Sequence, residues 1–339
     1  MTKNICISGY YGFDNFGDET ILKILVENIK KYSSDCSITV FSSNPNKTSE
    51  ELGVNSVYSF DLKGIFKSIS KCNCVISGGG SLLQDVTSKK SLLYYMFILF
   101  LAQLFGKKTM IFSQGIGPIR NSLLFKFAIC ILKKAKYVTV RDYKSFDLLK
   151  NNGVAAILCN DPVWNLKLND VQKTEKVGIQ LREYSCLTSS KIDKIAQLVN
   201  KYYSQKEINI FSFQNTFDMK ICKEFEQKLL AINPSINVKV IENTSNNKII
   251  EDILSLDILI AMRFHACLVG LKAGVKVLPL SYDIKVETLA KEFEIEYIDL
   301  FSSNSIEDIF DKFVNQEIKD NSAKINAKVF DFKSMIEQL

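Results

Sequence analysis

Arg263, His265 and Lys285 are the residues of this chain whose types and spacing best fit acid–base chemistry on an anion. Arg263 and His265 follow the apolar run 256–261 and precede a helix-like run, and Lys285 follows the next strand-like run, 276–280. A helix that starts beside a strand end presents free backbone N–H groups and the positive end of its dipole. Arginine adds a planar clamp for phosphate or carboxylate, and histidine exchanges a proton near neutral pH. The motif predicts an anion site, with a histidine packed at a helix start as the alternative.

Three glycine-rich loops, each placed after a predicted strand, are the second candidate region. They cover residues 8–19, 77–85 and 113–118. Glycine lets the backbone turn tightly and approach a ligand closely. The first loop lacks the G-x-G-x-x-G spacing of nicotinamide-cofactor sites, so that cofactor is poorly supported. We expect the loops to form one rim of a ligand cleft, with plain tight turns as the alternative, and Asp14 at the first loop's tip is the candidate general base.

Two further polar pairs follow predicted strands in the first half of the chain. Arg141 precedes Asp142, and two interpretations are open: Arg141 reaches into the cleft, or it lies at the surface and pairs with Asp142. Asp161 precedes Pro162, which favours a rigid entry to a linker over a catalytic acid.

The elements that must position these residues alternate between strand-like and helix-like runs. This alternation predicts a parallel sheet with helices on both faces, and the pattern restarts near residues 167–170. We therefore predict an α/β protein with two doubly wound, Rossmann-like domains, 1–166 and 167–339, that face a cleft. Ligands of such sheets bind at the carboxyl ends of the strands, where the candidate residues lie.

Composition narrows the class of protein. The 339 residues carry a net charge of +6 with scattered lysines and no long basic run, which argues against a nucleic-acid partner. Nine cysteines in mostly apolar contexts indicate a reduced, cytoplasmic chain, and the first residues lack the apolar core of a signal peptide. The single histidine leaves no cysteine–histidine cluster with metal-ligand spacing, so we expect no metal.

One segment, 92–102, is strongly apolar and flanked by Lys89, Lys90, Lys107 and Lys108. It is too short to cross a bilayer, which takes about 20 residues. Two interpretations are open: a buried helix, or a helix whose aromatic face also rests on lipid. The second would place the protein peripherally on the inner face of the cell membrane.

The motifs together resemble the polysaccharide pyruvyl transferase family, most closely its bacterial cell-wall, CsaB-like branch. The resemblance covers residues 4–300. Its matching motifs are Gly9-Tyr-Tyr-Gly12 with Gly17-Asp-Glu19, Ser77-Gly-Gly-Gly-Ser-Leu-Leu-Gln-Asp85, Gln114-Gly-Ile-Gly-Pro118, Arg141-Asp142, Asp161-Pro162, Met262-Arg-Phe-His265 and Ser281-Tyr-Asp-Ile-Lys285.

The resemblance implies a GT-B-like architecture and an enzyme that uses phosphoenolpyruvate as co-substrate, with no further cofactor. The expected reaction places a pyruvyl ketal on a sugar, N-acetylmannosamine of a lipid-linked secondary cell-wall polysaccharide precursor. His265 is the expected acid, and the expected phosphoenolpyruvate site comprises Arg263, His265 and Lys285 of the C-terminal domain together with Arg141 of the N-terminal domain. The expected acceptor site of the N-terminal domain comprises Tyr11, Asp14, Asn15, Gly79, Gly80, Gln84 and Gln114.

Two other functions fit the same features. A GT-B nucleotide-sugar glycosyltransferase would share the two-domain cleft and the phosphate-binding helix start, but it would bind a UDP-sugar and ignore phosphoenolpyruvate. A non-catalytic carbohydrate-binding protein would keep the glycine loops but would not need Arg263 and His265.

Overall fold

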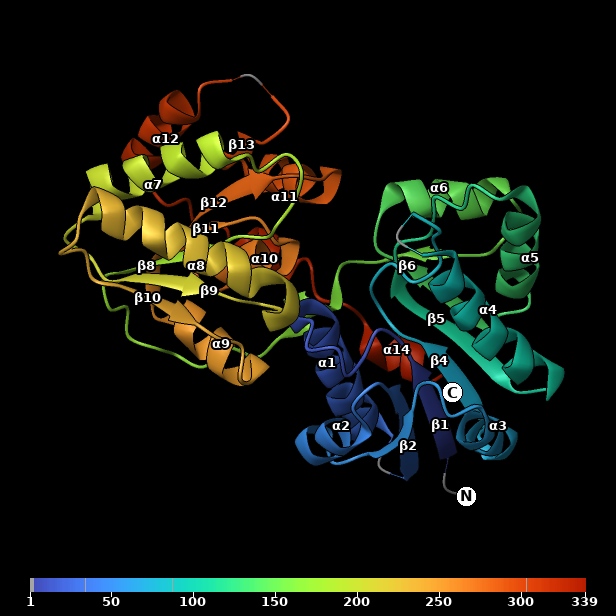
Figure 1. The fold of residues 1–339 in the computed structure, drawn as a ribbon. Coiled ribbons are helices and arrows are strands. Elements are labelled where there is room, and N and C mark those ends of the chain that lie inside the picture. The colour runs from blue at the N-terminus through green and yellow to red at the C-terminus, as the bar shows by residue number, and fades with distance from the viewer. Residues whose placement is uncertain (1–2, 34, 87, 303) are drawn as a thin grey trace. The chain divides into compact units, whose positions relative to one another are not determined.

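The computed structural model describes residues 3–33, 35–86, 88–302 and 304–339 (Figure 1). The chain forms two compact units. Unit 1 comprises Met1–Leu166 together with Lys328–Leu339, and unit 2 comprises Lys167–Ala327. Each unit has its own parallel sheet with helices on both faces, so the predicted α/β class with two doubly wound domains is confirmed. The cleft between the domains stays a prediction.

Unit 1 holds a seven-stranded parallel sheet in the order β3-β2-β1-β4-β5-β6-β7. Its strands are β1 Lys3–Ser8, β2 Cys36–Ser42, β3 Asn55–Tyr58, β4 Cys74–Ser77, β5 Lys108–Gln114, β6 Tyr137–Val140 and β7 Ile157–Leu158. Its helices are α1 Phe16–Tyr32, α2 Pro45–Leu52, α3 Leu62–Lys71, α4 Lys89–Leu104, α5 Ser122–Lys133, α6 Tyr143–Asn151, the 3₁₀ helix Pro162–Asn165 and α14 Phe332–Ile336.

Unit 2 holds a six-stranded parallel sheet in the order β10-β9-β8-β11-β12-β13. Its strands are β8 Lys176–Gln180, β9 Ile208–Phe211, β10 Val238–Ile241, β11 Leu256–Ala261, β12 Lys276–Ser281 and β13 Ile298–Asp299. Its helices are α7 Ser189–Tyr203, α8 Asn215–Ile232, α9 Asn246–Leu254, α10 Phe264–Lys272, α11 Ile284–Phe293, α12 Ile306–Asn315 and α13 Ser322–Asn326.

The strand order reverses once in each sheet, and these reversals decide where ligands can enter. In unit 1 the chain runs outward from β1 on one side and from β4 on the other, and in unit 2 the corresponding neighbours are β8 and β11. Helices leave opposite faces of the sheet at such a switch point, so a crevice opens beyond the carboxyl ends of the two strands. The glycine loops follow β1 and β4, and Arg263 follows β11.

The end of the chain corrects the predicted domain boundary. The sequence assigned every residue after 166 to the second domain, whereas Lys328–Leu339 packs on unit 1. Phe330 and Phe332 place their rings 5.1 and 5.5 Å from the ring of Phe112, and Asn165 exchanges two hydrogen bonds with the backbone of Phe330. Burial of these two aromatic rings, a large apolar area, holds the segment there.

Candidate functional site

Arg263 lies at the switch point of unit 2 and is held by a buried ion pair. It is the residue before α10, and its Nε and Nη2 donate to Oδ2 and Oδ1 of Asp218 at 3.0 and 2.7 Å. The Arg263 side chain is 10% exposed and that of Asp218 is fully buried. Such a bidentate pair is strong and directional, but it neutralises the charge that a ligand anion would use. Only the Nη1 edge of Arg263 and one Nη2 proton remain for other acceptors.

A polar network around this ion pair ties together the loops that follow three strands. Asp218 Oδ2 also accepts from the backbone N–H groups of Phe213 and Gln214, at 3.1 and 3.0 Å. Gln180 Oε1, at the end of β8, accepts from the N–H of Arg263 at 2.8 Å. The network fixes the start of α10 relative to the loops after β8 and β9.

His265 lies in the first turn of α10, partly exposed, with its ring 5.2 Å from that of Phe264. The helix begins at Phe264, so Arg263 precedes it. The side chains of Arg263 and His265 are therefore not forced onto different faces of a helix, as residues two apart within a helix would be. No side chain caps this helix start among the described residues, so its dipole and first N–H groups can serve an anion. The structure therefore places His265 beside an uncapped helix start, and its role as an acid stays a prediction.

Lys285 is in the first turn of α11, whose start is capped by Asp283. Asp283 Oδ1 accepts from the N–H groups of Lys285 and Val286 at 2.9 and 3.1 Å. Strands β11 and β12 are neighbours, and the helices α10 and α11 that follow them are in contact. The structure thus brings Lys285 to the same sheet edge as Arg263 and His265.

Arg182 is a cation at this edge that the sequence did not single out. It follows β8, is partly exposed, and has no carboxylate partner in the part of the chain that the structure describes. Its Nη1 is 3.3 Å from the hydroxyl of Tyr282, and its guanidinium carbon is 5.8 Å from the centre of that ring. Burial raises the pKa of Tyr282, and the charge of Arg182 partly offsets that rise. Its position two residues past the strand end was the available signal.

The glycine loops of unit 1 are filled by the protein's own side chains. A Cβ at Gly78 would lie 1.7 Å from the hydroxyl oxygen of Tyr11, and one at Gly9 would lie 2.3 Å from Cζ of the same ring. A Cβ at Gly79 would meet Ile21 at 2.7 Å. Tyr11 is fully buried, so its predicted contact with an acceptor sugar does not fit this structure. These glycines serve close packing of the loops.

We expect Gly78→Ala to destabilise unit 1 by about 1–3 kcal/mol, the usual cost of overpacking a filled site. Tyr11 Oη is buried with no hydrogen-bond partner among the described residues, so Tyr11→Phe alone should be close to neutral. The double variant Gly78→Ala/Tyr11→Phe should recover part of the loss, because the atom that the new methyl group meets is gone. Urea unfolding of the three variants measures this, and an unchanged midpoint for Gly78→Ala would contradict the packing role.

The other predicted acceptor residues divide into buried and accessible groups. Gln114 is fully buried, and its amide donates to Ser77 Oγ and the carbonyl of Gly78, while Gly80 is also buried. Gln84 is partly exposed and accepts from the N–H of Val86. Asn15 caps α1, and Asp14 has an exposed side chain in an ion pair with Lys47 at 2.8 Å. Of the predicted set, Asp14, Asn15 and Gln84 can reach a ligand without rearrangement.

Glu19 is the carboxyl group of this region with the most perturbed titration. Burial raises the pKa of Glu19 to about 8, and the nearby charge of Asp18 contributes to this rise. The N–H of Gly12, which donates to Glu19 Oε1 at 2.7 Å, opposes it. A carboxyl group with such a pKa can exchange protons near neutral pH. From sequence, Asp18 and Glu19 were each open to two interpretations, a cap of the next helix or a functional residue.

Arg141 lies in unit 1, apart from the other three predicted phosphoenolpyruvate residues, which all belong to unit 2. It pairs with Asp161 at 2.7 Å rather than with Asp142, and both side chains are buried. Asp142 instead caps α6 through Ser145. The pair Arg141–Asp161 therefore joins the ends of two segments of unit 1, and only the weaker contact of Nη2 with Ser81 Oγ, 3.4 Å, points toward a glycine loop.

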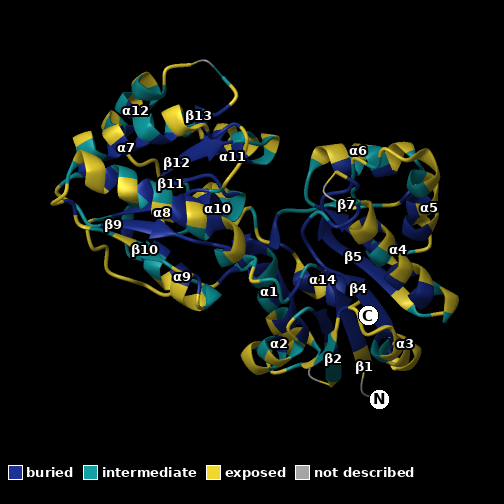
Figure 2. Cartoon of the chain, in the orientation of Figure 1, coloured by how far each residue is buried: buried dark blue, intermediate teal, exposed yellow. Residues whose placement is uncertain are grey.

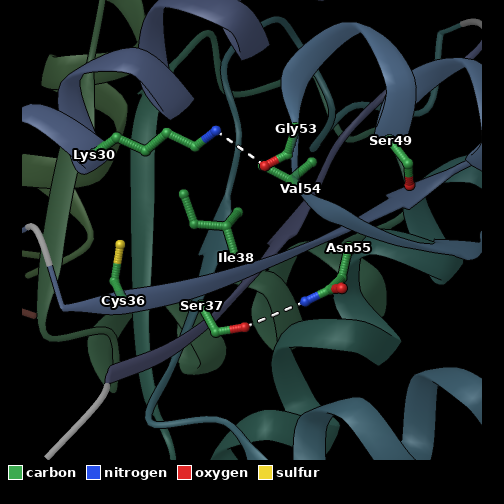
Figure 3. Close-up of a pocket in the computed structure, with 8 residues that line it drawn as sticks. All are labelled: Lys30, Cys36, Ser37, Ile38, Ser49, Gly53, Val54 and Asn55. Atoms are coloured by element: carbon green, nitrogen blue, oxygen red, sulfur yellow. Dashed lines mark hydrogen bonds between the residues drawn. The ribbon is translucent and has the colours of Figure 1, made fainter.

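A cavity of about 460 Å³ lies at the amino ends of β2 and β3, at the opposite edge of the unit 1 sheet from its switch point (Figure 3). Lys30 Nζ donates to the carbonyl of Gly53 at 3.0 Å there, and Asn55 donates to Ser37 Oγ at 3.2 Å. None of the predicted site residues lines it. Among the described residues, no group of three or more histidine, cysteine or carboxylate side chains could hold a metal ion.

Comparison with solved structures shows the fold. The chain is similar to a putative UDP-N-acetylglucosamine 2-epimerase from Listeria monocytogenes, with TM-score 0.67, 10% identity, and 99% of this chain and 94% of that chain covered. It is also similar to the UDP-GlcNAc 2-epimerase from Methanocaldococcus jannaschii, with TM-score 0.65, 13% identity, and 94% of each chain covered. Anabaena Alr3699/HepE in complex with UDP and glucose gives TM-score 0.59 and 12% identity, with 99% of this chain and 95% of that chain covered. The two-domain α/β fold is thus GT-B-like, as predicted.

Sequence comparison identifies the family. A search of curated proteins gives no match. The family model described as polysaccharide pyruvyl transferase matches residues 15–284, a span that includes β4 of unit 1, the switch point of unit 2, Arg141, Arg263 and His265, but neither β1 nor Lys285. The chain therefore belongs to the polysaccharide pyruvyl transferase family.

Proposed function

We propose that this protein transfers the pyruvyl group of phosphoenolpyruvate to two hydroxyl groups of one sugar and releases phosphate. The observation that carries the proposal is the edge of the unit 2 sheet, where Arg182, His265 and Lys285 follow the neighbouring strands β8, β11 and β12 and the start of α10 is uncapped. Phosphoenolpyruvate carries a phosphate and a carboxylate, so it needs more than one cation and gains from backbone N–H donors.

The donor clamp of this proposal differs in part from the one predicted from sequence. Arg263 keeps a free edge, but Asp218 already neutralises its charge, and Asp161 does the same for Arg141. Arg182 is the cation at the unit 2 edge best placed to add charge for a ligand, and Lys285 lies at the same edge. In this proposal Arg263 holds the start of α10 in place and contributes its remaining donors.

His265 is the proposed acid. It protonates C3 of the enol, and C2 becomes electrophilic, so a sugar hydroxyl attacks C2 and forms the first C–O bond while a base takes the hydroxyl proton. The bond from C2 to the phosphate oxygen breaks, and the second hydroxyl attacks C2 and closes the cyclic ketal while its proton goes to the departing phosphate. Asp14 is the proposed base, and Glu19 is a second carboxyl group of the same loop region that can exchange protons.

The proposed acceptor is a lipid-linked saccharide, an N-acetylmannosamine-containing precursor of a secondary cell-wall polysaccharide as in CsaB-like enzymes. The protein would then work in the cytoplasm, peripherally on the inner face of the membrane. The family of the chain supports a polysaccharide-related acceptor, since the matching model is that of polysaccharide pyruvyl transferases.

Mass spectrometry of candidate saccharides after incubation with phosphoenolpyruvate tests the reaction. The product should gain the mass of one pyruvate less one water, with one phosphate released per product. A parallel incubation with a UDP-sugar tests the glycosyltransferase alternative, because GT-B neighbours include a protein solved with UDP and glucose. Sugar transfer from the UDP-sugar without any gain from phosphoenolpyruvate would overturn the proposal.

A further inference from the structure

Helix α4 presents an apolar stripe to solvent. Between residues 93 and 104 the exposed residues are Leu93, Phe97, Phe100 and Leu104, spaced as one stripe along the helix. Leu93 and Leu104 are 48% and 66% exposed, although the opposite side of the helix is buried against the sheet. A helix at the surface of a globular protein normally turns a polar face to water, so α4 departs from this rule (Figure 2).

The stripe continues onto the two neighbouring helices of unit 1. Phe66 of α3 is 52% exposed and packs edge-on against Phe105, directly after α4, with ring centres 4.9 Å apart. Phe127 of α5 is 40% exposed and lies 5.5 Å from the ring of Phe100. We call the surface formed by Phe66, Leu93, Phe97, Phe100, Leu104 and Phe127 the three-helix face. Contiguous apolar surfaces of this kind mark interaction sites.

The charges of the same three helices have one sign. Helices α3, α4 and α5 contain seven lysines and no arginine, aspartate or glutamate, although the whole chain has 43 basic and 37 acidic residues. All seven lysines are exposed, and none forms an ion pair with a described residue. Lys63 and Lys67 flank Phe66 on α3, and Lys126 precedes Phe127 on α5. An apolar surface beside unpaired lysines complements an anionic lipid surface.

We propose that the three-helix face docks unit 1 onto an anionic membrane, with α4 lying in the interface rather than across the bilayer. Among the described residues no helix is long and apolar enough to cross a membrane. The apolar side chains would enter the boundary between headgroups and acyl chains, and the lysines would keep their amines among the headgroups. The proposal deepens the peripheral location given under the proposed function, but its test needs no sugar or phosphoenolpyruvate, so either can fail without the other.

Flotation of the full chain with vesicles tests the docking. Vesicles of phosphatidylglycerol and phosphatidylcholine should carry the protein upward at low salt, and pure phosphatidylcholine vesicles should carry much less. Neutralising Lys63, Lys67 and Lys126 to glutamine should reduce partitioning by about fivefold for each charge removed, as expected for a lysine near an anionic surface. Leu93→Gln with Leu104→Gln should lower it by at least about tenfold, since both leucines lose a favourable transfer into lipid.

Matched controls lie on unit 2, on equally exposed positions. Phe301→Ser with Ile318→Ser replaces two exposed apolar residues, and Lys223→Gln with Lys312→Gln removes two exposed, unpaired charges. These variants should float like the wild type, and circular dichroism should show that all variants are folded.

Three results would overturn the proposal. The wild type could fail to float with anionic vesicles. The control variants could lose as much binding as the variants of the three-helix face. The protein could instead dimerise without lipid, with Leu93→Gln/Leu104→Gln abolishing the dimer, which would make the face an interface between two copies.

Discussion

Arg263→Met is expected to destabilise unit 2 by about 3–5 kcal/mol, because it leaves the buried carboxylate of Asp218 without its counter-charge. The remaining partners of Asp218 are two backbone N–H groups, which do not replace a bidentate guanidinium. The loss of stability should appear as a lower urea midpoint for unit 2, which is measured by hydrogen exchange of the backbone amides in β11 and α10. Exchange reports each unit separately, which matters because a two-unit chain need not unfold in one step.

A double-mutant cycle separates the ion pair from the rest of the network. The cycle combines Arg263→Met with Asp218→Asn, because asparagine keeps an oxygen that can accept from the N–H groups of Phe213 and Gln214. The coupling free energy between positions 263 and 218 should exceed about 2 kcal/mol. The control is the exposed pair of Lys220 on α8 with Glu183, also 3.0 Å apart, whose side chains are 78% and 62% exposed. Its coupling should stay below about 1 kcal/mol. Equal couplings for the two pairs would contradict the structural role assigned to Arg263.

Because Arg263 has this structural role, a change in phosphoenolpyruvate affinity in an Arg263 variant has two explanations. A raised KM for phosphoenolpyruvate in an Arg263 variant would not identify a ligand contact, because the start of α10 would move as well. Arg182 has no carboxylate partner in the described part of the chain, so Arg182→Gln tests the donor clamp more directly. Sequence could not distinguish the two arginines, because each comes within two residues of a strand end in unit 2.

The elements with strong periodic patterns were predictable, and those that depend on packing were not. Long apolar runs such as β11 and α4 identified the alternating fold and the boundary near residue 166. The region 43–72 gave no prediction, yet it forms α2, β3 and α3. These elements are short, and most of α2 and β3 is partly or fully exposed, so little apolar periodicity marks them. The return of α14 to unit 1 depends on aromatic contacts across the chain, which no local pattern contains.

The candidate site shows the same division. The predicted residues that follow strand ends lie at the carboxyl edges of the two sheets, because topology alone decides which edge they share, while their roles in a ligand site stay predictions. Their partners were not predictable: Asp218 and Asp161 neutralise the predicted arginines, and Tyr11 fills the space over Gly78. A glycine gives the same signal in sequence whether a ligand or a neighbouring ring occupies the space that its missing side chain leaves.

His265→Gln is expected to lower kcat for pyruvyl transfer by about 10²–10⁴-fold, the usual contribution of a positioned general acid. The KM for phosphoenolpyruvate should change little, because Arg182, Lys285 and the start of α10 remain to bind the anion. A fall in kcat with an unchanged KM separates the loss of an acid from the loss of donor binding.

The chain offers an unusually direct check, because His265 is its only histidine. Its imidazole signals in an NMR spectrum need no assignment by mutation, and they should shift when phosphoenolpyruvate is added. Phe264→Leu is the matched control: it disturbs the packing of the His265 ring, 5.2 Å away, but keeps the imidazole and should keep most of kcat. If folded His265→Gln turned over at nearly the wild-type rate, the proton at C3 would have to come from another group, and Glu19, whose pKa burial raises to about 8, would be the next residue to substitute.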